Sequence, residues 1–266
     1  MEPIPSVYAI GDSWLHPTRV ITPRLVREYG KQYLILDPHE KILNNYGDST
    51  DRAFFKNFSR ASLTFDRALN VVPTLQEWSK APPNVTLLQI GSCDLANTPL
   101  GQEDVASKYK NKLIEFVTSW IEKTRQMSNN VVDFNDAVKK HKWLVVCPSD
   151  WGSFGEGTGL QDSDKYRQAR RKASIGLNRK QKKLYGEYNI VLLKPRIEHA
   201  DRVGIHIRNH SLEEYNYLVW GAVCKLLCTS CKFTEDFIKE EHDNIMDGLC
   251  KRTSADGAPP AGAAAY

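Results

Sequence analysis

The chain has 266 residues, of which 41% are hydrophobic and 26% charged, and its net charge is +4. This composition excludes a disordered polymer, and the sequence lacks the run of about 18 apolar residues that a membrane-spanning helix needs. Its six cysteines are too few for a secreted disulfide scaffold, and the N-terminus has neither the basic nor the apolar region of a signal peptide. We therefore expect an intracellular, cytoplasmic protein with reduced thiols and no membrane partner.

Short apolar runs rich in β-branched residues alternate with longer helical stretches. Continuous apolar runs are typical of strands buried on both faces, and the long connections fit crossover helices. The pattern predicts an α/β fold, namely a three-layer α/β/α sandwich around a five-stranded parallel sheet of flavodoxin-like topology. The predicted strands are 7–10, 33–36, 85–90, 143–146 and 190–193, and the predicted helices are 19–29, 103–126, 162–185 and 212–227.

The chain reads as one domain followed by two terminal segments. Residues 1–232 form the predicted domain, in which 51–78 is expected to fold as short helices around Pro73. Residues 233–250 are acidic and predict a C-terminal helix, and the Ala/Gly/Pro-rich residues 251–266 predict a disordered tail.

Polar residues follow four of the predicted strands, at the sheet edge where open parallel sheets place their sites. Strand one ends in Gly11-Asp12-Ser13, where a serine suits a nucleophile but is also an ordinary helix cap. Gly47 follows strand two and is suited either to presenting a bare N–H or to a simple turn. Strand three runs into Gly91-Ser92-Cys93-Asp94, and strand five leads to residues 201–206.

In this order, the four blocks resemble the motifs of the SGNH/GDSL hydrolase superfamily, over residues 7 to 227. The resemblance implies that Ser13 is the nucleophile, Gly47 an oxyanion donor through its N–H, and His206 the general base. It also implies a carboxyl-ester hydrolase that acts on a small-molecule or acylated substrate and needs no cofactor or metal.

Two positions depart from the family pattern. Cys93 stands where the family has an asparagine whose amide donates to the oxyanion, and a thiol is a poor donor. Val203 stands where the family has the acid that orients the histidine, so the nearest carboxylate is Asp201 and a more remote one is Asp150. Two hypotheses remain: a serine esterase that uses a Ser13–His206 dyad with a weakened oxyanion hole, or a fold retained for binding after catalysis faded.

A basic helix is predicted over 165–183. Residues 162–183 include nine Lys or Arg and two Asp, which is typical either of a solvated helix face or of a phosphate-binding stripe. The segment is similar to an arginine-rich helix in esterase-like domains of some retrotransposon first open reading frames. That similarity implies a nucleic-acid partner, for which the candidate contacts are Arg167, Arg170, Arg171 and Arg179.

The remaining cysteines favour packing over metal binding. Cys224, Cys228 and Cys231 share one helix face, and the last two have CxxC spacing. Because no second CxxC or paired histidine follows at a suitable distance, we interpret them as small apolar core residues.

Overall fold

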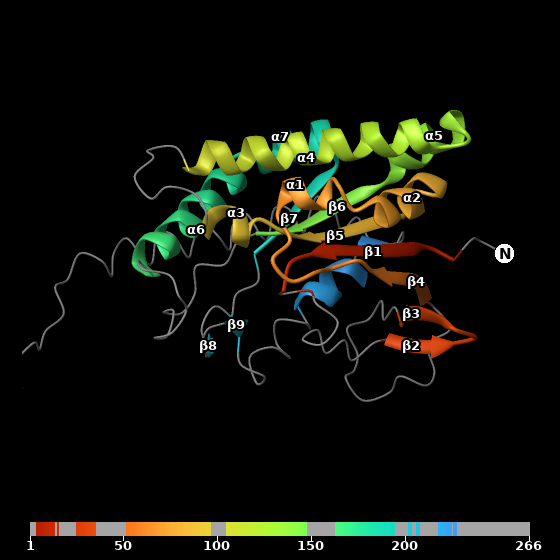
Figure 1. Cartoon of the computed structure of the whole chain (residues 1–266), viewed down its shortest axis with the longest axis horizontal. Helices are drawn as coiled ribbons and strands as arrows, with labels where there is room; N and C mark the ends of the chain where they lie inside the picture. The colour runs from red at the N-terminus through yellow and green to blue at the C-terminus, as the bar shows by residue number, and fades with distance from the viewer. Residues whose placement is uncertain are drawn as a thin grey trace, which may run out of the picture.

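The computed structural model describes residues 4–13, 15, 25–35, 52–96, 105–147, 163–194, 202–203, 206–207, 218–224 and 226–227. Within them, seven strands form one sheet in the order β2-β3-β4-β1-β5-β6-β7 (Figure 1). These strands are β1 (Ser6–Gly11), β2 (Leu25–Glu28), β3 (Lys31–Ile35), β4 (Arg52–Asn57), β5 (Val85–Gln89), β6 (Lys142–Val146) and β7 (Ile190–Leu193). A separate pair joins β8 (Arg202–Val203) to β9 (His206–Ile207).

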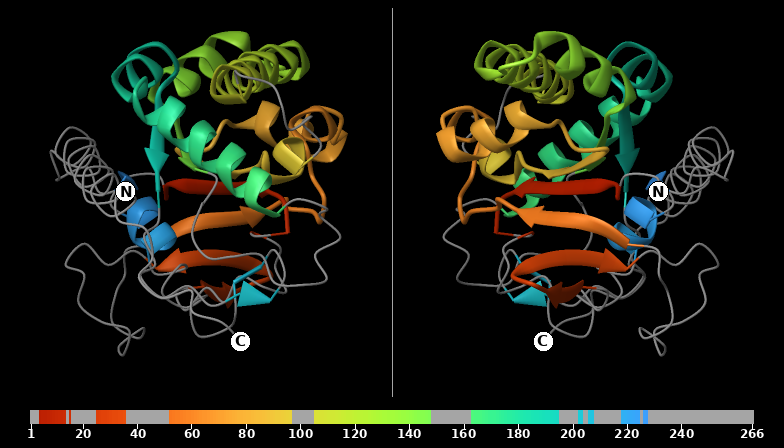
Figure 2. Two further views of the ribbon diagram at one scale, coloured as in Figure 1. Left: turned by 90° about the vertical axis from the view of Figure 1, so that its left-hand side faces the viewer. Right: turned by 90° about the vertical axis from the view of Figure 1, so that its right-hand side faces the viewer.

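The sheet differs from the prediction in strand number and in the identity of one parallel strand. Strands β4, β1, β5, β6 and β7 are parallel, whereas β2 and β3 add an antiparallel hairpin at one edge (Figure 2). The predicted second strand corresponds to β3 and is therefore antiparallel. Its place beside β1 is taken by β4, which lies inside the region predicted to be helical.

Local sequence explains both errors. In β4 the buried Ala53 and Phe55 alternate with half-buried residues, which is the pattern of a strand covered on one face more than on the other. The predicted helix 19–29 instead contains β2, which ends at the turn Tyr29–Gly30, where φ is 50° and 74°. Two loop residues with positive φ match the twist of a tight hairpin, so this dipeptide reverses the chain into β3.

The helices cover both faces of the sheet, which confirms the predicted three-layer α/β/α class (Figure 1). One face packs against helices that follow β4, β5 and β6 in the chain. The other face packs against the helical residues 218–224, whose Val219 and Trp220 are buried. The helices are α1 (Phe65–Ala68), α2 (Val72–Lys80), α3 (Ser92–Ala96), α4 (Val105–Met127), α5 (Val131–Lys140), α6 (Ser163–Asn178) and α7 (Gln181–Tyr188).

The structure divides one of the predicted helices. The predicted basic helix is two helices, because the chain turns at residues 179–180 between α6 and α7. Residues 233–266, predicted as a helix and a tail, lie outside the described part of the chain. Across the ranges given above, no helix is both long and apolar enough to cross a membrane.

Candidate active site

Ser13 lies in a turn immediately after β1. The Asp12 N–H donates to the Gln89 carbonyl oxygen of β5 (3.0 Å), and the Leu15 N–H donates to the Asp12 carbonyl oxygen (3.2 Å). Ser13 is therefore the second residue of a turn at the carboxyl end of the sheet, and it is only half-buried. The turn is anchored by Leu15, whose side chain is fully buried in the core.

Gly11 is required for this arrangement. A Cβ at position 11 would lie 2.7 Å from the Gln89 carbonyl oxygen and 2.8 Å from Leu15 Cδ1. Any larger residue would therefore push β1 away from β5 or displace Leu15. The glycine of the Gly11-Asp12-Ser13 block is therefore required for a steric reason, because it lets the Ser13 turn pack closely against β5.

The second polar block, 91–96, continues from β5 into α3. Asp94 is buried, accepts a hydrogen bond from the Phe65 N–H (3.2 Å), and forms an ion pair with Lys112 (3.5 Å). These contacts tie α3 to the start of α1 and to α4. Burial raises the pKa of the Asp94 carboxyl, while the Phe65 N–H and Lys112 oppose that rise.

Cys93 lies beside the Ser13 turn but is poorly suited to act as a nucleophile. Burial raises the pKa of its thiol to about 11, and the negative charges of Asp12 and Asp94 add to the rise. Gly11 at the end of β1 pairs with Gln89 at the end of β5, so the two strand ends meet, as the strand-end argument predicts. The thiol, with its raised pKa, therefore stays protonated at neutral pH, which favours a residue that takes no part in the chemistry over an alternative nucleophile.

The structure changes the strand-end argument for Gly47, while the family resemblance that also assigned it stays untested. Because β3 is antiparallel, its carboxyl end lies at the rim opposite Ser13. The segment after β4 lies beside β1 instead, since the Phe58 N–H donates to Ala9 (2.8 Å) and the Arg60 N–H to Gly11 (2.9 Å). Gly47 itself is outside the described residues.

One residue of the segment after β4 has the backbone expected of a glycine. Ser62 has a φ of 57°, in the left-handed region that glycine adopts most easily. Ser62 lies at the end of the segment that begins beside Ala9. This segment therefore brings backbone N–H groups to the rim of the sheet where Ser13 lies, and these groups are candidates for binding an oxyanion. The positive φ has no signal in the local sequence, because the position carries serine.

The base block folds as a short hairpin. In the β8–β9 pair, Val203 is opposite His206 and Arg202 is opposite Ile207. The side chain of His206 is outside the described residues, as are Asp201 and Asp150. The Ser13–His206 dyad therefore stays a prediction.

The candidate nucleic-acid contacts do not form one exposed stripe. Arg170 is only 2% exposed, because α6 turns the face with Ala169 and Ala173 towards the core. Its charge acts on the buried hydroxyl of Tyr109, so Arg170 faces inward and is no surface contact for phosphate. Arg171 is half-buried, Arg179 is exposed, and the side chain of Arg167 is not described.

The structure describes only part of the candidate metal and cysteine sites. Within the ranges that the structure covers, no group of three His, Cys, Asp or Glu is placed to hold a metal ion. Cys224 is buried among the residues that cover the second face of the sheet, which suits the packing interpretation. Cys228 and Cys231 lie outside those ranges.

The chain is similar to solved structures of esterases and lipases. A putative GDSL-like lipase from Parabacteroides merdae is 12% identical, with a TM-score of 0.49, and the match covers 84% of this chain and 98% of that one. A putative acylhydrolase from Bacteroides fragilis is 12% identical, with a TM-score of 0.44 and coverages of 83% and 89%. The SGNH-hydrolase family esterase AlinE4 is 16% identical, with a TM-score of 0.34 and coverages of 85% and 98%.

No family model matches the sequence, and no curated protein matches it. At the low identities of the solved structures, their activities do not transfer to this chain, so its chemistry has to be argued from its own residues.

Proposed function

We propose that the chain is a carboxyl-ester hydrolase with Ser13 as its nucleophile. The observation that carries the proposal is the position of Ser13 in the turn directly after β1, beside the ends of β4 and β5. Gly11 and Leu15 hold this turn, while Ser13 itself is only half-buried. A substrate carbonyl can therefore approach the hydroxyl from the rim of the sheet.

The reaction would follow the acyl-transfer route of serine hydrolases. The Ser13 oxygen attacks the carbonyl carbon while His206 takes the hydroxyl proton, and backbone N–H groups stabilise the oxyanion. The carbon–oxygen bond to the alcohol then breaks, and the alcohol leaves with the proton held by His206. Water hydrolyses the acyl-enzyme by the same steps. The N–H groups of Ser13, Ala61 and Ser62 are the candidate oxyanion donors, because those of Phe58, Ser59 and Arg60 already donate to Ala9, Asn57 and Gly11.

This set of catalytic groups is less complete than the set that the family pattern implies. Cys93 supplies no amide donor, and loss of one oxyanion donor costs on the order of 10²–10³ in rate in a well-studied protease. Val203 cannot orient the imidazole, so we assign that role to Asp201, the residue that precedes β8 in the sequence. The expected activity is slow hydrolysis of activated esters.

The test is hydrolysis of p-nitrophenyl butyrate by the purified protein and by its Ser13→Ala and His206→Ala variants. The matched control is Ser128→Ala, which changes a half-buried serine between α4 and α5, at the other end of the sheet (Figure 1). We expect both site variants to lose turnover and the control to keep it. Equal rates for wild type and Ser13→Ala would contradict the proposal and favour a binding module without catalysis.

A further inference from the structure

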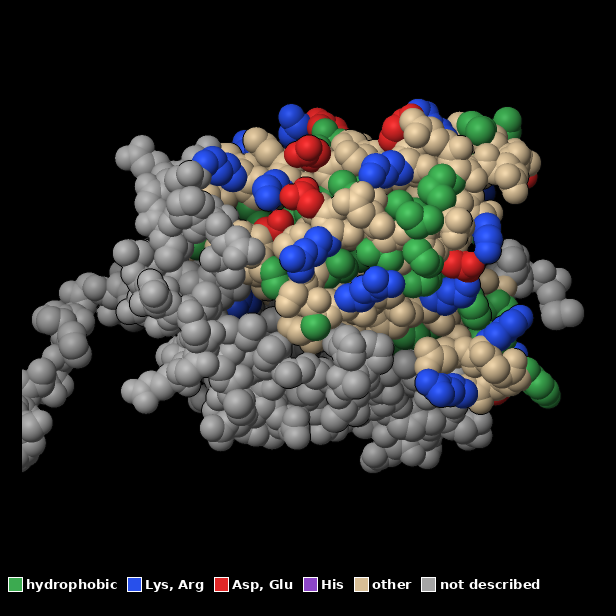
Figure 3. Space-filling model, viewed as in Figure 1, with side chains coloured by type: hydrophobic (Ala, Val, Ile, Leu, Met, Phe, Trp, Pro, Cys, Tyr) green, Lys and Arg blue, Asp and Glu red, His purple; other side chains and the backbone are tan. Residues whose placement is uncertain are grey.

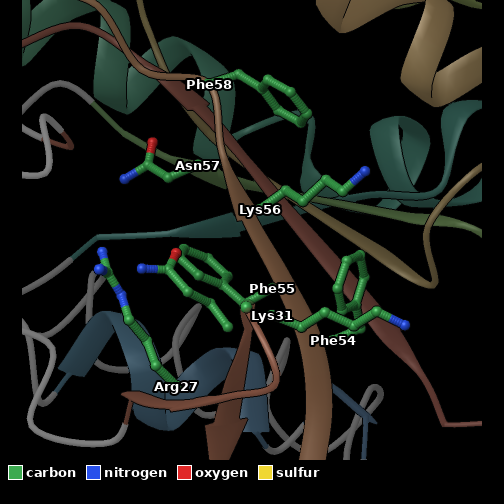
Figure 4. Close-up of a pocket in the computed structure, with 9 residues that line it drawn as sticks. Arg27, Lys31, Phe54, Phe55, Lys56, Asn57 and Phe58 are labelled. Carbon is green, nitrogen blue, oxygen red and sulfur yellow. The ribbon is translucent and has the colours of Figure 1, made fainter.

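A pocket of about 660 Å³ lies between the end of β4 and the turn that joins β2 to β3 (Figure 4). It exists because the ladder between β3 and β4 stops at Gln32 and Phe55, while β4 continues to Asn57. The hairpin turn at Gly30 therefore borders an open space instead of a paired strand. This volume is within the range of small-molecule sites.

The pocket is positively charged. Of the nine residues that line it, Arg27, Lys31 and Lys56 are cations and none is acidic. Lys56 is already neutralised, since it forms an ion pair with Glu77 of α2, whose pKa Lys56 and Lys80 together lower to about 2. Of the other two cations, Arg27 lies on the Asn57 side of β4 and Lys31 on the opposite side (Figure 4), so Arg27 is the cation available to a ligand beside Asn57. In the space-filling view, Lys and Arg side chains form a band across the face that contains β1 and β4 (Figure 3).

The Arg27 guanidinium is held in place by a neutral partner. With the Gln32 amide oriented so that both of its groups are satisfied, the Gln32 side-chain oxygen accepts from Nε (3.0 Å) and Nη2 (2.9 Å) of Arg27. This contact positions the guanidinium without cancelling its charge. Figure 4 shows Arg27 and Asn57 on the same side of β4.

Aromatic side chains form the apolar part of the pocket. Phe54 and Phe58 are half-buried, and Phe55 is buried, where its ring packs edge-on against Trp220 at 5.1 Å between centroids. Phe55 pairs with Gln32, which holds Arg27, so a ring and a cation share one face of the sheet. This combination suits a ligand with an apolar body and a negatively charged group.

The pocket is connected to the Ser13 turn through Asn57. The Asn57 side-chain amide donates to the Leu15 carbonyl oxygen (2.9 Å), and its side-chain oxygen accepts from the Ser59 N–H (2.9 Å). Leu15 closes the turn in which Ser13 lies. One side chain therefore forms both a wall of the pocket and the support of the nucleophile turn.

We propose that this pocket binds the acid end of a carboxylate-bearing substrate, so that the preferred ester has an anionic acyl chain. This inference rests on the proposed function for its link to catalysis, but the binding preference can be measured without turnover. Arg27 would hold the carboxylate, and Phe55, whose partner Gln32 contacts Arg27 on the same face, would contact the hydrocarbon chain.

Binding is tested by titration calorimetry on Ser13→Ala protein at low salt, with 2-naphthoate and its neutral isostere 2-naphthamide. We expect naphthoate to bind at least about tenfold more tightly, and expect that preference to vanish in the Arg27→Gln/Lys31→Gln double variant. The control double variant Lys139→Gln/Lys140→Gln removes the same charge at the far end of α5 and should keep the preference. Equal affinity for the two ligands, or an equal effect of both double variants, would overturn the proposal.

Turnover supplies an independent readout with the mono-p-nitrophenyl ester of adipate and p-nitrophenyl hexanoate. We expect a higher kcat/KM for the adipate ester in wild type and no such difference in Arg27→Gln/Lys31→Gln. A preference that survives in that double variant contradicts the pocket assignment. Absence of Ser13-dependent turnover while naphthoate still binds selectively would instead contradict the proposed function and support the anion site.

Discussion

Gly91 lies against Tyr109 so closely that a Cβ at position 91 would come within 2.6 Å of the tyrosine hydroxyl oxygen. That hydroxyl is fixed, because it donates to the Ile90 carbonyl oxygen at 2.7 Å, and Gly91 has a φ of 106°. Gly91→Ala therefore adds both a steric clash and backbone strain. We expect the free energy of unfolding to fall by about 3 kcal/mol, measured by urea denaturation.

A second glycine provides the control for this substitution. Gly186 lies in α7, and a Cβ there meets nothing within 4 Å. Gly186→Ala should raise the free energy of unfolding by roughly 0.5–1 kcal/mol, because alanine is the better helix former. Similar stabilities for the two variants would show that the contact with Tyr109 is not tight.

Five of the sheet strands could be located from sequence because each contains a continuous apolar run, although the run in β3 gave no sign of its antiparallel direction. Strands β1, β5, β6 and β7 lie in the interior or on the far edge and are buried on both faces. The strand β4 has a mixed sequence in which buried and half-buried residues alternate, and the short strand β2 ends in the charged pair Arg27–Glu28. The Tyr29–Gly30 turn was a signal for the hairpin that the helical interpretation of 19–29 missed.

The candidate site shows the same division. Ser13 and Cys93 could be placed at one rim because β1 and β5 are parallel neighbours. The position of Gly47 could not be inferred in the same way. The order of strands along the chain does not reveal that β4, and not β3, lies beside β1 in the sheet. Likewise, the burial of Arg170 depends on which face of α6 packs against the core. Because its neighbours in the sequence are charged, the sequence predicted an exposed side chain.

Cys93→Asn is expected to increase esterase activity. The asparagine amide would restore a hydrogen-bond donor at the position where the thiol donates poorly, and one such donor is worth up to about 10²-fold in rate. Steady-state kinetics with p-nitrophenyl butyrate measures the gain. Cys93→Ala is the control and should leave the rate near that of wild type. A large loss in Cys93→Ala would instead indicate that the thiol takes part in catalysis.

His141 is predicted to make stability depend on pH. Burial lowers the pKa of its imidazole to about 4, against a hydrogen bond to the Pro83 carbonyl oxygen (2.6 Å) that favours the charged form. Since the unfolded chain binds a proton near pH 6.5, the unfolded state is favoured as pH falls from about 6.5 towards 4. The histidine should cost about 2 kcal/mol of stability between pH 7 and pH 5.

Urea denaturation of wild type and His141→Gln at about pH 7 and pH 5 isolates this contribution. Glutamine keeps a donor for Pro83 but has no titrating ring. The variant should lose less stability on acidification than wild type does. An identical loss in both proteins would mean that His141 keeps an ordinary pKa in the fold.

Reaction with an alkyl fluorophosphonate tests the assignment of the nucleophile most directly. Attack by the Ser13 oxygen on phosphorus would form a P–O bond and expel fluoride, leaving a stable adduct that intact-mass and peptide mass spectrometry can locate. We predict one adduct per chain, on the peptide that contains Ser13, absent from Ser13→Ala and much slower to form in His206→Ala. No adduct on wild type, or one that persists in Ser13→Ala, would contradict the account.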